Sequence, residues 1–420
     1  MSGKSELKIF DDYPPQVVVE SGYFEDIHPT TSLDNVSVLE FVIPSSNVDY
    51  LDLNDTLLTL KLKIVKKDGS AFKDTDIKPV PENFFLYSLF SDVSLQLNDI
   101  QIDGGSSIYP FKASIESLLN FNKESIESKL QCLGFDMSKD NRQKWVGKSD
   151  IFEISGALRL DFLNQPKYLI PGVNIRIRLT RSTDDFALVN KKGDTDPGDG
   201  AYKIIITHAL LYVRRVKVHP AITKAHTLGL ETKNALYPYN RSKTVSFTIP
   251  QGSTSYFKDN LFSSNLLPKL VVIGMVRGAA FSGTLKQDSL WFENFAITSL
   301  DLLRDGQSLP YRRGYSCQDG KNLYTDVYVR SILQNMNLLN TNSNSYITYD
   351  NFKKGQCLFV FNLTPDFDLQ ERQIARDSNL RLDLSFNAAL SEAINVIAYA
   401  LYDATLQITS NRDIIKDVYS

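Results

Sequence analysis

The side chains that most often do chemistry are sparse in this sequence. It contains four histidines, and His219 and His226 stand seven residues apart without the H-E-x-x-H spacing of a zinc site. His208 lies in a strand pattern, which favours a packed or surface role over a catalytic one. No phosphate-binding G-x-x-x-x-G-K-[ST] and no G-x-S-x-G nucleophile motif occurs. We therefore predict no catalytic residue, no cofactor and no enzymatic activity.

Metal ligation is the next chemistry to consider. The three cysteines have no metal-ligand spacing and suit a reduced compartment without a disulfide framework: Cys132, Cys317 and Cys357. The acids Asp194, Asp196 and Asp199 lie close together, but Gly198 stands where an EF-hand would have its third ligand, and Pro197 stiffens the loop. We predict no metal site and an exposed, solvated turn here, with a structural cation as the alternative.

The composition excludes several classes of protein. The 420 residues, 42% hydrophobic and 23% charged, are typical of a folded chain with more than one domain. The formal net charge of −3 argues against a protein that condenses nucleic acid. No apolar run approaches the ~18 residues of a membrane span, so we expect none.

The elements that would position any site are mostly strands. In residues 56–66, Leu58, Leu60, Leu62 and Ile64 alternate with polar residues, which predicts one buried and one exposed face. The same alternation or a long β-rich run occurs at Leu158–Phe162, Val173–Arg181, Tyr202–Val218, Leu380–Leu384 and Ile394–Thr409. The sequence therefore predicts an all-β protein.

Two helices interrupt this pattern. Phe111, Ile115, Leu118 and Leu119 have the spacing of one helical face, and Pro110 suits a first helical turn. A weaker helical pattern runs from Leu323 through Val327 to Ile332. Long polar stretches at 120–150 and 182–200 read as loops.

The order of the elements repeats. In each half a strand (Val93–Leu97, Ser299–Leu303) is followed by a turn, a short strand (Tyr109–Pro110, Leu309–Tyr311), a helix and a paired set of strands. The paired strands are predicted at Gly156–Leu163 with Gly172–Thr180, and at Cys357–Leu363 with Ser378–Phe386. Matching elements are offset by about 200 residues, too long a period for a solenoid, which indicates one β-sandwich duplicated within the chain. Two unrelated β domains are the alternative.

Several segments are similar to a known family. Leu89–Asn98, Ile108–Lys112 and Ile115–Leu119 resemble the capsid proteins of Polinton (Maverick) elements and adintovirus-like viruses. Leu158–Phe162 and Leu169–Val173 resemble the same family. The similarity covers most of the first half, whereas the second half matches by the order of its elements.

This resemblance implies a double jelly-roll major capsid protein, in which two consecutive jelly-roll β-sandwiches carry short helices in the loops between strands. We expect an N-terminal arm at 1–30, a first jelly roll at 31–220, a linker at 221–243, a second jelly roll at 244–410 and a C-terminal tail at 411–420.

The resemblance also implies partners and a location. The expected partner is the chain itself, as a homotrimer with a pseudo-hexagonal outline that tiles laterally into an icosahedral shell around DNA. Penton and minor capsid proteins are further expected partners, and the location is the virion capsid, assembled in the nucleus or cytoplasm of the host cell. A near-neutral chain suits such assembly, because it limits repulsion between copies.

Two features could serve a capsid protein directly. Ile102–Gly105 resembles the Gly-Gly sites that maturation proteases cut, but a turn that uses the positive φ of glycine is favoured. The basic residues Arg214, Arg215 and Lys217, and the pair Arg312 and Arg313, could contact packaged DNA non-specifically. Paired bases at a strand end are more often merely solvated.

Two other functions stay open. A carbohydrate- or receptor-binding β-sandwich, such as a fibre or lectin, would use some of the 20 tyrosines as aromatic platforms, although core packing also explains them. A β-sandwich hydrolase would need a close pair of buried carboxylates in a cleft.

Overall fold

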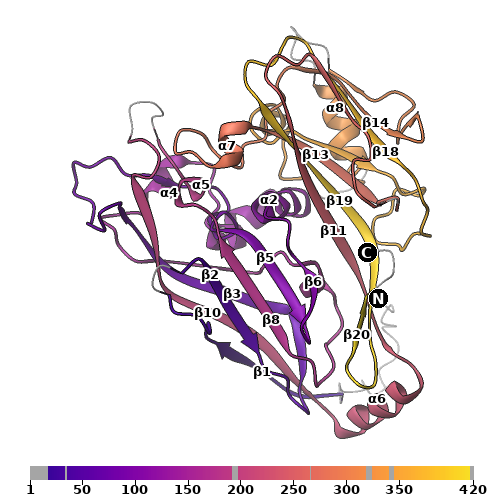
Figure 1. The fold of residues 1–420 in the computed structure, drawn as a ribbon. Helices are drawn as coiled ribbons and strands as arrows, with labels where there is room; N and C mark the ends of the chain where they lie inside the picture. The colour runs from indigo at the N-terminus through magenta and orange to yellow at the C-terminus, as the bar shows by residue number, and fades with distance from the viewer. Residues whose placement is uncertain are drawn as a thin grey trace, which may run out of the picture.

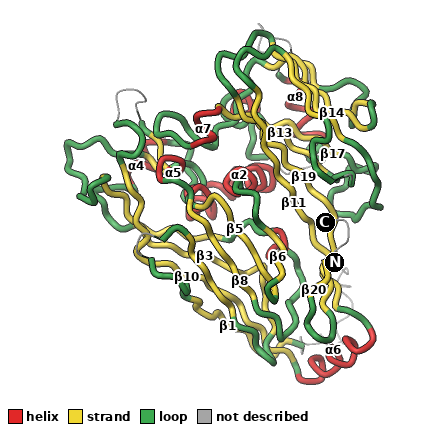
Figure 2. The backbone as a smooth tube through the Cα atoms, in the orientation of Figure 1, coloured by secondary structure: helices red, strands yellow, loops and turns green. Residues whose placement is uncertain are grey.

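Two β-sandwiches lie side by side, with helix α2 (Tyr109–Asn120) between them, in the computed structural model (Figures 1 and 2). The structure describes residues 18–33, 36–191, 197–264, 266–317, 324–339 and 345–416. Helix α6 (Pro220–Thr232) connects the sandwiches at the lower end of the molecule in the view of Figure 1.

The first sandwich consists of two antiparallel sheets. Their strand orders are β1-β10-β3-β7 and β2-β8-β5-β6. The bounds of these strands are β1 (Val19–Ile27), β2 (Val38–Ile43), β3 (Tyr50–Lys66), β5 (Phe90–Leu97), β6 (Ile100–Asp103), β7 (Phe152–Gly156), β8 (Ile175–Arg181) and β10 (Tyr202–Val218).

The second sandwich repeats this plan strand for strand. Its sheets have the orders β11-β19-β13-β17 and β12-β18-β14-β15. The bounds are β11 (Ala235–Ile249), β12 (Ser255–Lys258), β13 (Leu270–Arg277), β14 (Ile297–Arg304), β15 (Gln307–Ser308), β17 (Leu358–Asn362), β18 (Leu380–Phe386) and β19 (Ile394–Ile408). If the strands of each sandwich are ranked in chain order, strands of equal rank occupy the same position in the sheets of the two sandwiches. This repeat confirms the predicted fold of two consecutive jelly rolls, called roll 1 and roll 2 below.

Shorter elements complete the fold. The additional strands are β4 (Val80–Pro81), β9 (Leu188–Val189), β16 (Tyr315–Ser316) and β20 (Ile414–Lys416). The additional α-helices are α1 (Phe85–Ser88), α3 (Lys123–Ser125), α4 (Lys139–Lys144), α5 (Asp184–Ala187), α7 (Gly278–Ser282), α8 (Thr325–Tyr328) and α9 (Tyr349–Lys353). Short 3-10 or π turns lie at Ile126–Leu130, Gln131–Leu133, Asp161–Asn164 and Val329–Gln334. The described residues include no helix that is long and apolar enough to cross a membrane.

The alternating strands bury one face each, as the sequence predicts. In β3 the residues Leu58, Leu60, Leu62 and Ile64 are fully buried, whereas Lys61 between them is exposed. Burying one such side chain stabilises the fold by roughly 1.5–3 kcal/mol. The predicted bounds of β10 and β18 also agree closely with the structure.

Three predicted strands are wrong. Tyr109 and Pro110 form the first turn of α2, because proline lacks the N–H that a strand ladder needs but suits the start of a helix. Leu309 and Pro310 lie in bends after β15, because Pro310 has no N–H to donate to a strand ladder. The segment Leu158–Phe162 pairs with no strand and enters the 3-10 turn at Asp161.

Four elements of the structure lie wholly or partly in segments predicted to be an arm, a linker or a tail. Strand β1 lies inside the predicted arm and pairs with β10; α6 and part of β11 occupy the predicted linker; and β20, in the predicted tail, pairs with β19. Strand β1 escaped prediction because it is an edge strand with exposed residues on both faces, so its sequence shows no alternation. The remaining residues of the predicted arm and tail, 1–17 and 417–420, lie outside the described residues.

Candidate functional site

Several charged residues are buried at the junction between the two rolls. Helix α2 is buried on all sides from Tyr109 to Leu118, since β19 and β11 of roll 2 cover the face that roll 1 leaves open (Figure 1). Lys112 and Glu116 lie on this helix one turn apart, which places both charges inside the protein.

Lys112 holds three segments of roll 1 together. Its Nζ lies 2.9 Å from Oδ1 of Asp161 and 3.5 Å from Oδ2 of Asp103. Asp103 ends β6, and Asp161 begins a 3-10 turn. Despite desolvation, these two carboxylates and Glu116 hold the pKa of Lys112 above its usual value, so the ammonium stays charged.

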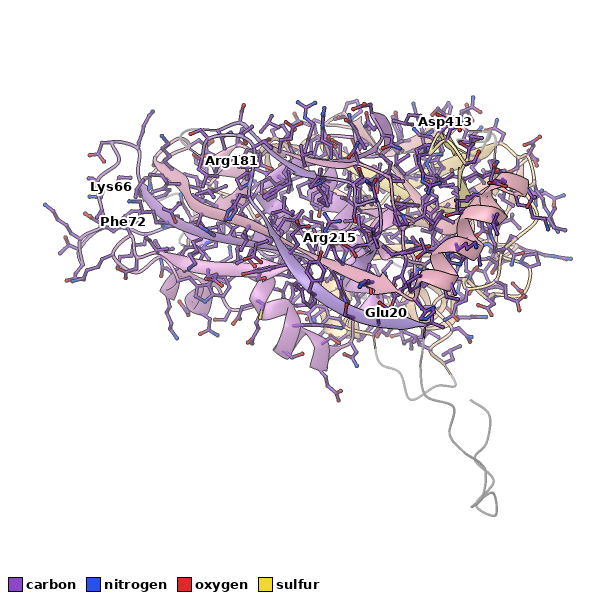
Figure 3. The ribbon with its side chains drawn as sticks, turned by 90° about the horizontal axis from the view of Figure 1, so that it is seen from below. Glu20, Lys66, Phe72, Arg181, Arg215 and Asp413 are labelled. Carbon is purple, nitrogen blue, oxygen red and sulfur yellow. The ribbon has the colours of Figure 1, made fainter. Side chains whose placement is uncertain are left out.

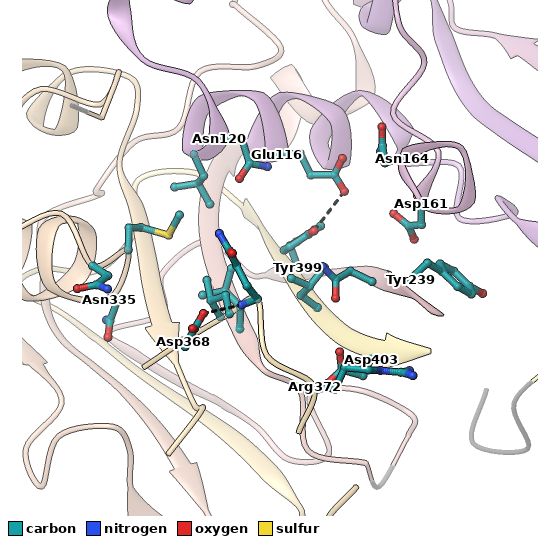
Figure 4. Close-up of a pocket in the computed structure, with 18 of the residues that line it drawn as sticks. Glu116, Asn120, Asp161, Asn164, Tyr239, Asn335, Asp368, Arg372, Tyr399 and Asp403 are labelled. Atoms are coloured by element: carbon teal, nitrogen blue, oxygen red, sulfur yellow. Dashed lines mark hydrogen bonds between the residues drawn. The ribbon is translucent and has the colours of Figure 1, made fainter. Parts of the chain in front are cut away.

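Hydrogen bonds from this cluster cross to roll 2. Asp161 accepts one from the backbone N–H of Ser242 in β11 at 2.7 Å, and one from the Ser242 hydroxyl at 2.9 Å. The hydroxyl of Tyr399 in β19 donates to Oε1 of Glu116 at 3.2 Å (Figure 4). Asp161 and Glu116 of roll 1 therefore each contact a strand of roll 2.

Burial sets the protonation of these acids. Desolvation raises the pKa of Glu116 to about 7, because the attraction of Lys112 only partly offsets the loss of water around the charged form. Desolvation also raises the pKa of Asp161 to about 6, with the nearby Asp103 adding to it.

A cleft opens beside this cluster. Its volume is about 940 Å³, and Glu116, Arg159, Asp161, Tyr399 and Asp403 are among the residues that line it. Figure 4 shows Glu116 and Asp161 on one side of the cleft, with Asp403 on the other. The Arg159 guanidinium lies 4.7 Å from the centre of the Phe121 ring, a cation–π contact that covers one end of the cluster.

The pair Glu116 and Asp161 is the kind of buried carboxylate pair that a hydrolase would need. However, both oxygens of Asp161 accept hydrogen bonds, from Lys112 and Ser242, and Glu116 accepts one from Tyr399. An acid or base catalyst must present a carboxyl oxygen to its substrate. The partners of these carboxylates therefore favour a structural junction.

A further buried acid, Glu82, joins the rolls near α4. Oε2 of Glu82, which follows β4, accepts a hydrogen bond from the backbone N–H of Ser289 in roll 2 at 2.9 Å. Its Oε1 lies 3.9 Å from Nη1 of the buried Arg142. Desolvation raises the pKa of Glu82 to about 7, with Asp288 adding to the rise.

The histidines singled out in the sequence do not come together as a site. His219 caps α6 by accepting from the N–H of Ala221, whereas Nδ1 of His226 lies 2.8 Å from the hydroxyl of Tyr50. His208 lies on β10, with its ring 6.3 Å from that of His28.

The acidic loop has a contact that the sequence did not reveal. Asp199 is exposed, as predicted, but its Oδ1 accepts hydrogen bonds from the Thr284 hydroxyl at 2.9 Å and the Leu285 N–H at 2.8 Å. Asp194 and Asp196 lie outside the described residues. In the part of the chain that the structure describes, no group of three potential ligands could hold a metal ion.

The basic residues at the end of β10 are paired with acids. Arg214 contacts Asp52 and Asp55, Arg215 contacts Glu25, and Lys217 lies 3.5 Å from Glu20. Figure 3 shows Glu20 and Arg215 on the neighbouring strands β1 and β10. Arg312 and Arg313 are exposed. The β10 cations are therefore engaged within their own sheet.

The di-glycine is a turn, as favoured from the sequence. Gly104 and Gly105 have φ angles of 100° and 89°, which residues with a Cβ rarely adopt. The N–H of Gly105 donates to Oδ1 of Asp92 at 2.8 Å, which fixes the turn against β5.

Sequence reasoning missed the cluster around Lys112. Asp161 was placed on the exposed face of a strand, and the helix was expected to bury only one face. The available signal was the spacing of Lys112 and Glu116, four residues apart within an aromatic helix. That spacing alone also fits an exposed helix face, because burial here depends on roll 2.

Comparison with known proteins extends this description. No family model matches the chain. An uncharacterized protein of Caenorhabditis elegans is 23% identical over 397 residues, which cover 90% of this chain and 93% of that protein.

Solved structures resemble the chain over nearly its whole length. A chain of the Sputnik virophage is 14% identical with a TM-score of 0.60, and covers 99% of this chain and 92% of its own. A chain of the PBCV-1 virus capsid is 12% identical with a TM-score of 0.59, covering 97% and 98%. The mavirus major capsid protein is 12% identical with a TM-score of 0.58, covering 99% and 94%. The likeness shows that this chain has the double jelly-roll fold of these viral proteins.

Proposed function

We propose that this chain is a structural major capsid protein that forms trimers and tiles a shell. The observation that carries the proposal is the strand-for-strand repeat of two jelly rolls in one chain, matched over 99% of its length by the mavirus major capsid protein. Within this class we assign it to the capsid proteins of Polinton (Maverick) elements and adintovirus-like viruses, on the segments quoted from the sequence.

The geometry gives the proposed function a physical basis. Three chains with two similar rolls each present six similar units, and a closed ring of such units has a pseudo-hexagonal outline. Such a unit tiles a surface only if the angle between its two rolls is fixed. The buried contacts of Asp161 with Ser242, and of Glu116 with Tyr399, favour a fixed angle.

The proposed partners follow from this role. The chain contacts its own copies first, and penton and minor capsid proteins complete an icosahedral shell around DNA. Contact with the genome is at most non-specific, because the cations at the end of β10 are already paired with acids. Assembly takes place in the nucleus or cytoplasm of the host cell.

The structure gives little support to the sugar-binding form of the alternative, a carbohydrate- or receptor-binding β-sandwich protein. Several tyrosines that could form an aromatic platform are buried instead, among them Tyr87, Tyr237, Tyr315 and Tyr399. A buried ring cannot stack on a sugar.

The experiment is the solution mass of the purified chain by light scattering, with negative-stain images of the same sample. We expect the mass of three 47.4 kDa chains and a pseudo-hexagonal outline. A stable monomer that does not tile at any protein concentration or ionic strength would refute the proposal and favour a binding module.

A further inference from the structure

A second cavity, at the lower end of roll 2, collects positive charge. Its volume is about 210 Å³, and it borders the cleft at Arg372 and Asp403 (Figure 4). Four cationic side chains line it, together with a single carboxylate: Arg241, Lys243, Lys269, Arg372 and Asp403. This charge balance is unusual in a chain whose net charge is −3.

The register of the sheet places a further cation beside this cavity. Arg241 lies directly opposite Tyr402, Lys243 opposite Ala400, and Lys416 of β20 opposite Leu406. Directly opposite residues of an antiparallel pair point to the same face. Arg241, Lys243 and Lys416 therefore share the face of the sheet that carries Tyr402.

These three cations have no carboxylate partner among the described residues, although Nζ of Lys243 donates a hydrogen bond to Oγ of Ser263 at 2.6 Å. Burial lowers the pKa of Lys243 and of Lys416, and the Arg241 guanidinium lowers both further. Arg241 forms no ion pair with any described residue. The single carboxylate is already occupied, because Asp403 accepts from Lys269 Nζ at 3.1 Å and from the Gln373 N–H at 2.8 Å. Like charges kept close without a counter-charge destabilise a fold unless an anion joins them.

An unpartnered buried donor supplies the second observation. The Tyr402 side chain lines this cavity and is only 7% exposed, yet its hydroxyl finds no hydrogen-bond partner among the described residues. A buried hydroxyl without a partner costs about 1–3 kcal/mol, and a ligand that accepts its hydrogen bond would remove this cost.

We propose that this cavity binds a phosphate group, held by Arg241, Lys243 and the hydroxyl of Tyr402. A phosphate oxygen accepts the Tyr402 O–H, and guanidinium and ammonium groups supply the charge-assisted bonds that phosphate prefers. The group can come from free inorganic phosphate or from a phosphodiester of a nucleic acid. The inference is independent of the capsid proposal, because it concerns only the residues of this cavity.

The test is isothermal titration calorimetry of the full-length protein with two probes, inorganic phosphate and a 15-nucleotide oligothymidylate. We expect saturable binding of at least one probe with one site per chain. Binding of phosphate alone identifies the free anion, and binding of the oligonucleotide identifies the phosphodiester. No saturable binding of either probe at low ionic strength overturns the proposal.

Three variants locate the site. Arg241→Gln should weaken binding roughly tenfold or more, as for the loss of a charge-assisted contact. Tyr402→Phe should weaken it about threefold and leave thermal stability unchanged or raised, because the lost hydroxyl has no partner in the protein. Arg176→Gln, which removes an exposed cation of roll 1, is the matched control and should bind as the parent does.

Two results would contradict the assignment. Equal affinity of the parent and the Arg241→Gln variant would place the anion elsewhere. Binding of a hexaglutamate peptide as tightly as either phosphate probe would assign the cavity to the carboxylates of an acidic protein segment.

Discussion

The buried acid Glu116 makes the stability of the folded chain depend on pH. Its pKa is about 7 in the folded chain against an ordinary value of 4.5, so the folded state binds this proton more tightly than the unfolded state. The stability from this group is fully present below pH 4.5 and is lost as the pH rises through about 7. The pKa of Glu82 is also raised from 4.5 to about 7, so its contribution to stability is likewise lost as the pH rises through about 7.

We predict that Glu116→Gln stabilises the chain at pH 8 by about 2 kcal/mol, since the neutral amide needs no charge to be buried. The measurement is urea unfolding at pH 5 and pH 8. The variant should lose less stability than the parent between these two values. Glu153→Gln, at an exposed position of β7, should match the parent at both. An unchanged pH dependence in Glu116→Gln would show that the acid is not buried in charged form.

Lys112 is the counter-charge of the cluster. Replacing it by methionine should destabilise the chain by about 3–5 kcal/mol, because Asp103 and Asp161 would lose their buried cation. The measurement is again urea unfolding. Lys61→Met removes the exposed pair of Lys61 with Glu153 and should cost at most about 1 kcal/mol. Equal losses in the two variants would contradict the buried cluster.

At the scale of elements, the β5–β6 hairpin depends on one glycine. A Cβ on Gly104 would lie 2.5 Å from the Cα of Ser94, and its φ of +100° is unfavourable for a residue with a Cβ. We predict that Gly104→Ala destabilises the chain by about 3 kcal/mol. The control is Gly252→Ala, where φ is +84° but nothing lies within 4 Å, so only backbone strain of about 1 kcal/mol remains. Thermal unfolding compares the two, and similar losses would show that the close approach to Ser94 is unimportant.

At the scale of the whole molecule, the junction should make the two rolls unfold together. Backbone and side-chain hydrogen bonds cross it at Asp161, Glu116, Glu82 and Asp199. We predict one calorimetric transition, with equal calorimetric and van't Hoff enthalpies. The double variant Ser242→Ala with Tyr399→Phe should broaden or split it. Two transitions in the parent would mean that the rolls are independent.

The ends of the chain offer a test of assembly at the same scale. If the segments outside the sandwiches act as arms, deleting residues 1–17 should spare the trimer and weaken tiling. Deleting residues 1–30 should also damage the fold, because it removes β1 from its sheet. Light scattering and negative-stain images compare the two. Normal shells from the shorter deletion would contradict the arm.

The sequence by itself determined the strands that bury one face, because alternation with period two depends only on neighbouring residues. Residues 56–66 and 380–384 are examples. The repeated order of such elements indicated a duplicated β-sandwich, and the family resemblance implied that each sandwich is a jelly roll. The same local signal failed for β1, which has no buried face.

Only the tertiary structure decided where Lys112, Glu116 and Asp161 lie. Each has a sequence neighbourhood that fits a solvated surface, and each is buried because a strand of roll 2, more than 80 residues further along the chain, covers it. The cavity at Arg241 and Tyr402 arises in the same way, from strands β11 and β19, which are distant in sequence and adjacent in the sheet. Contacts between distant residues leave no periodic signal, so burial of charge at such sites follows from packing and not from local pattern.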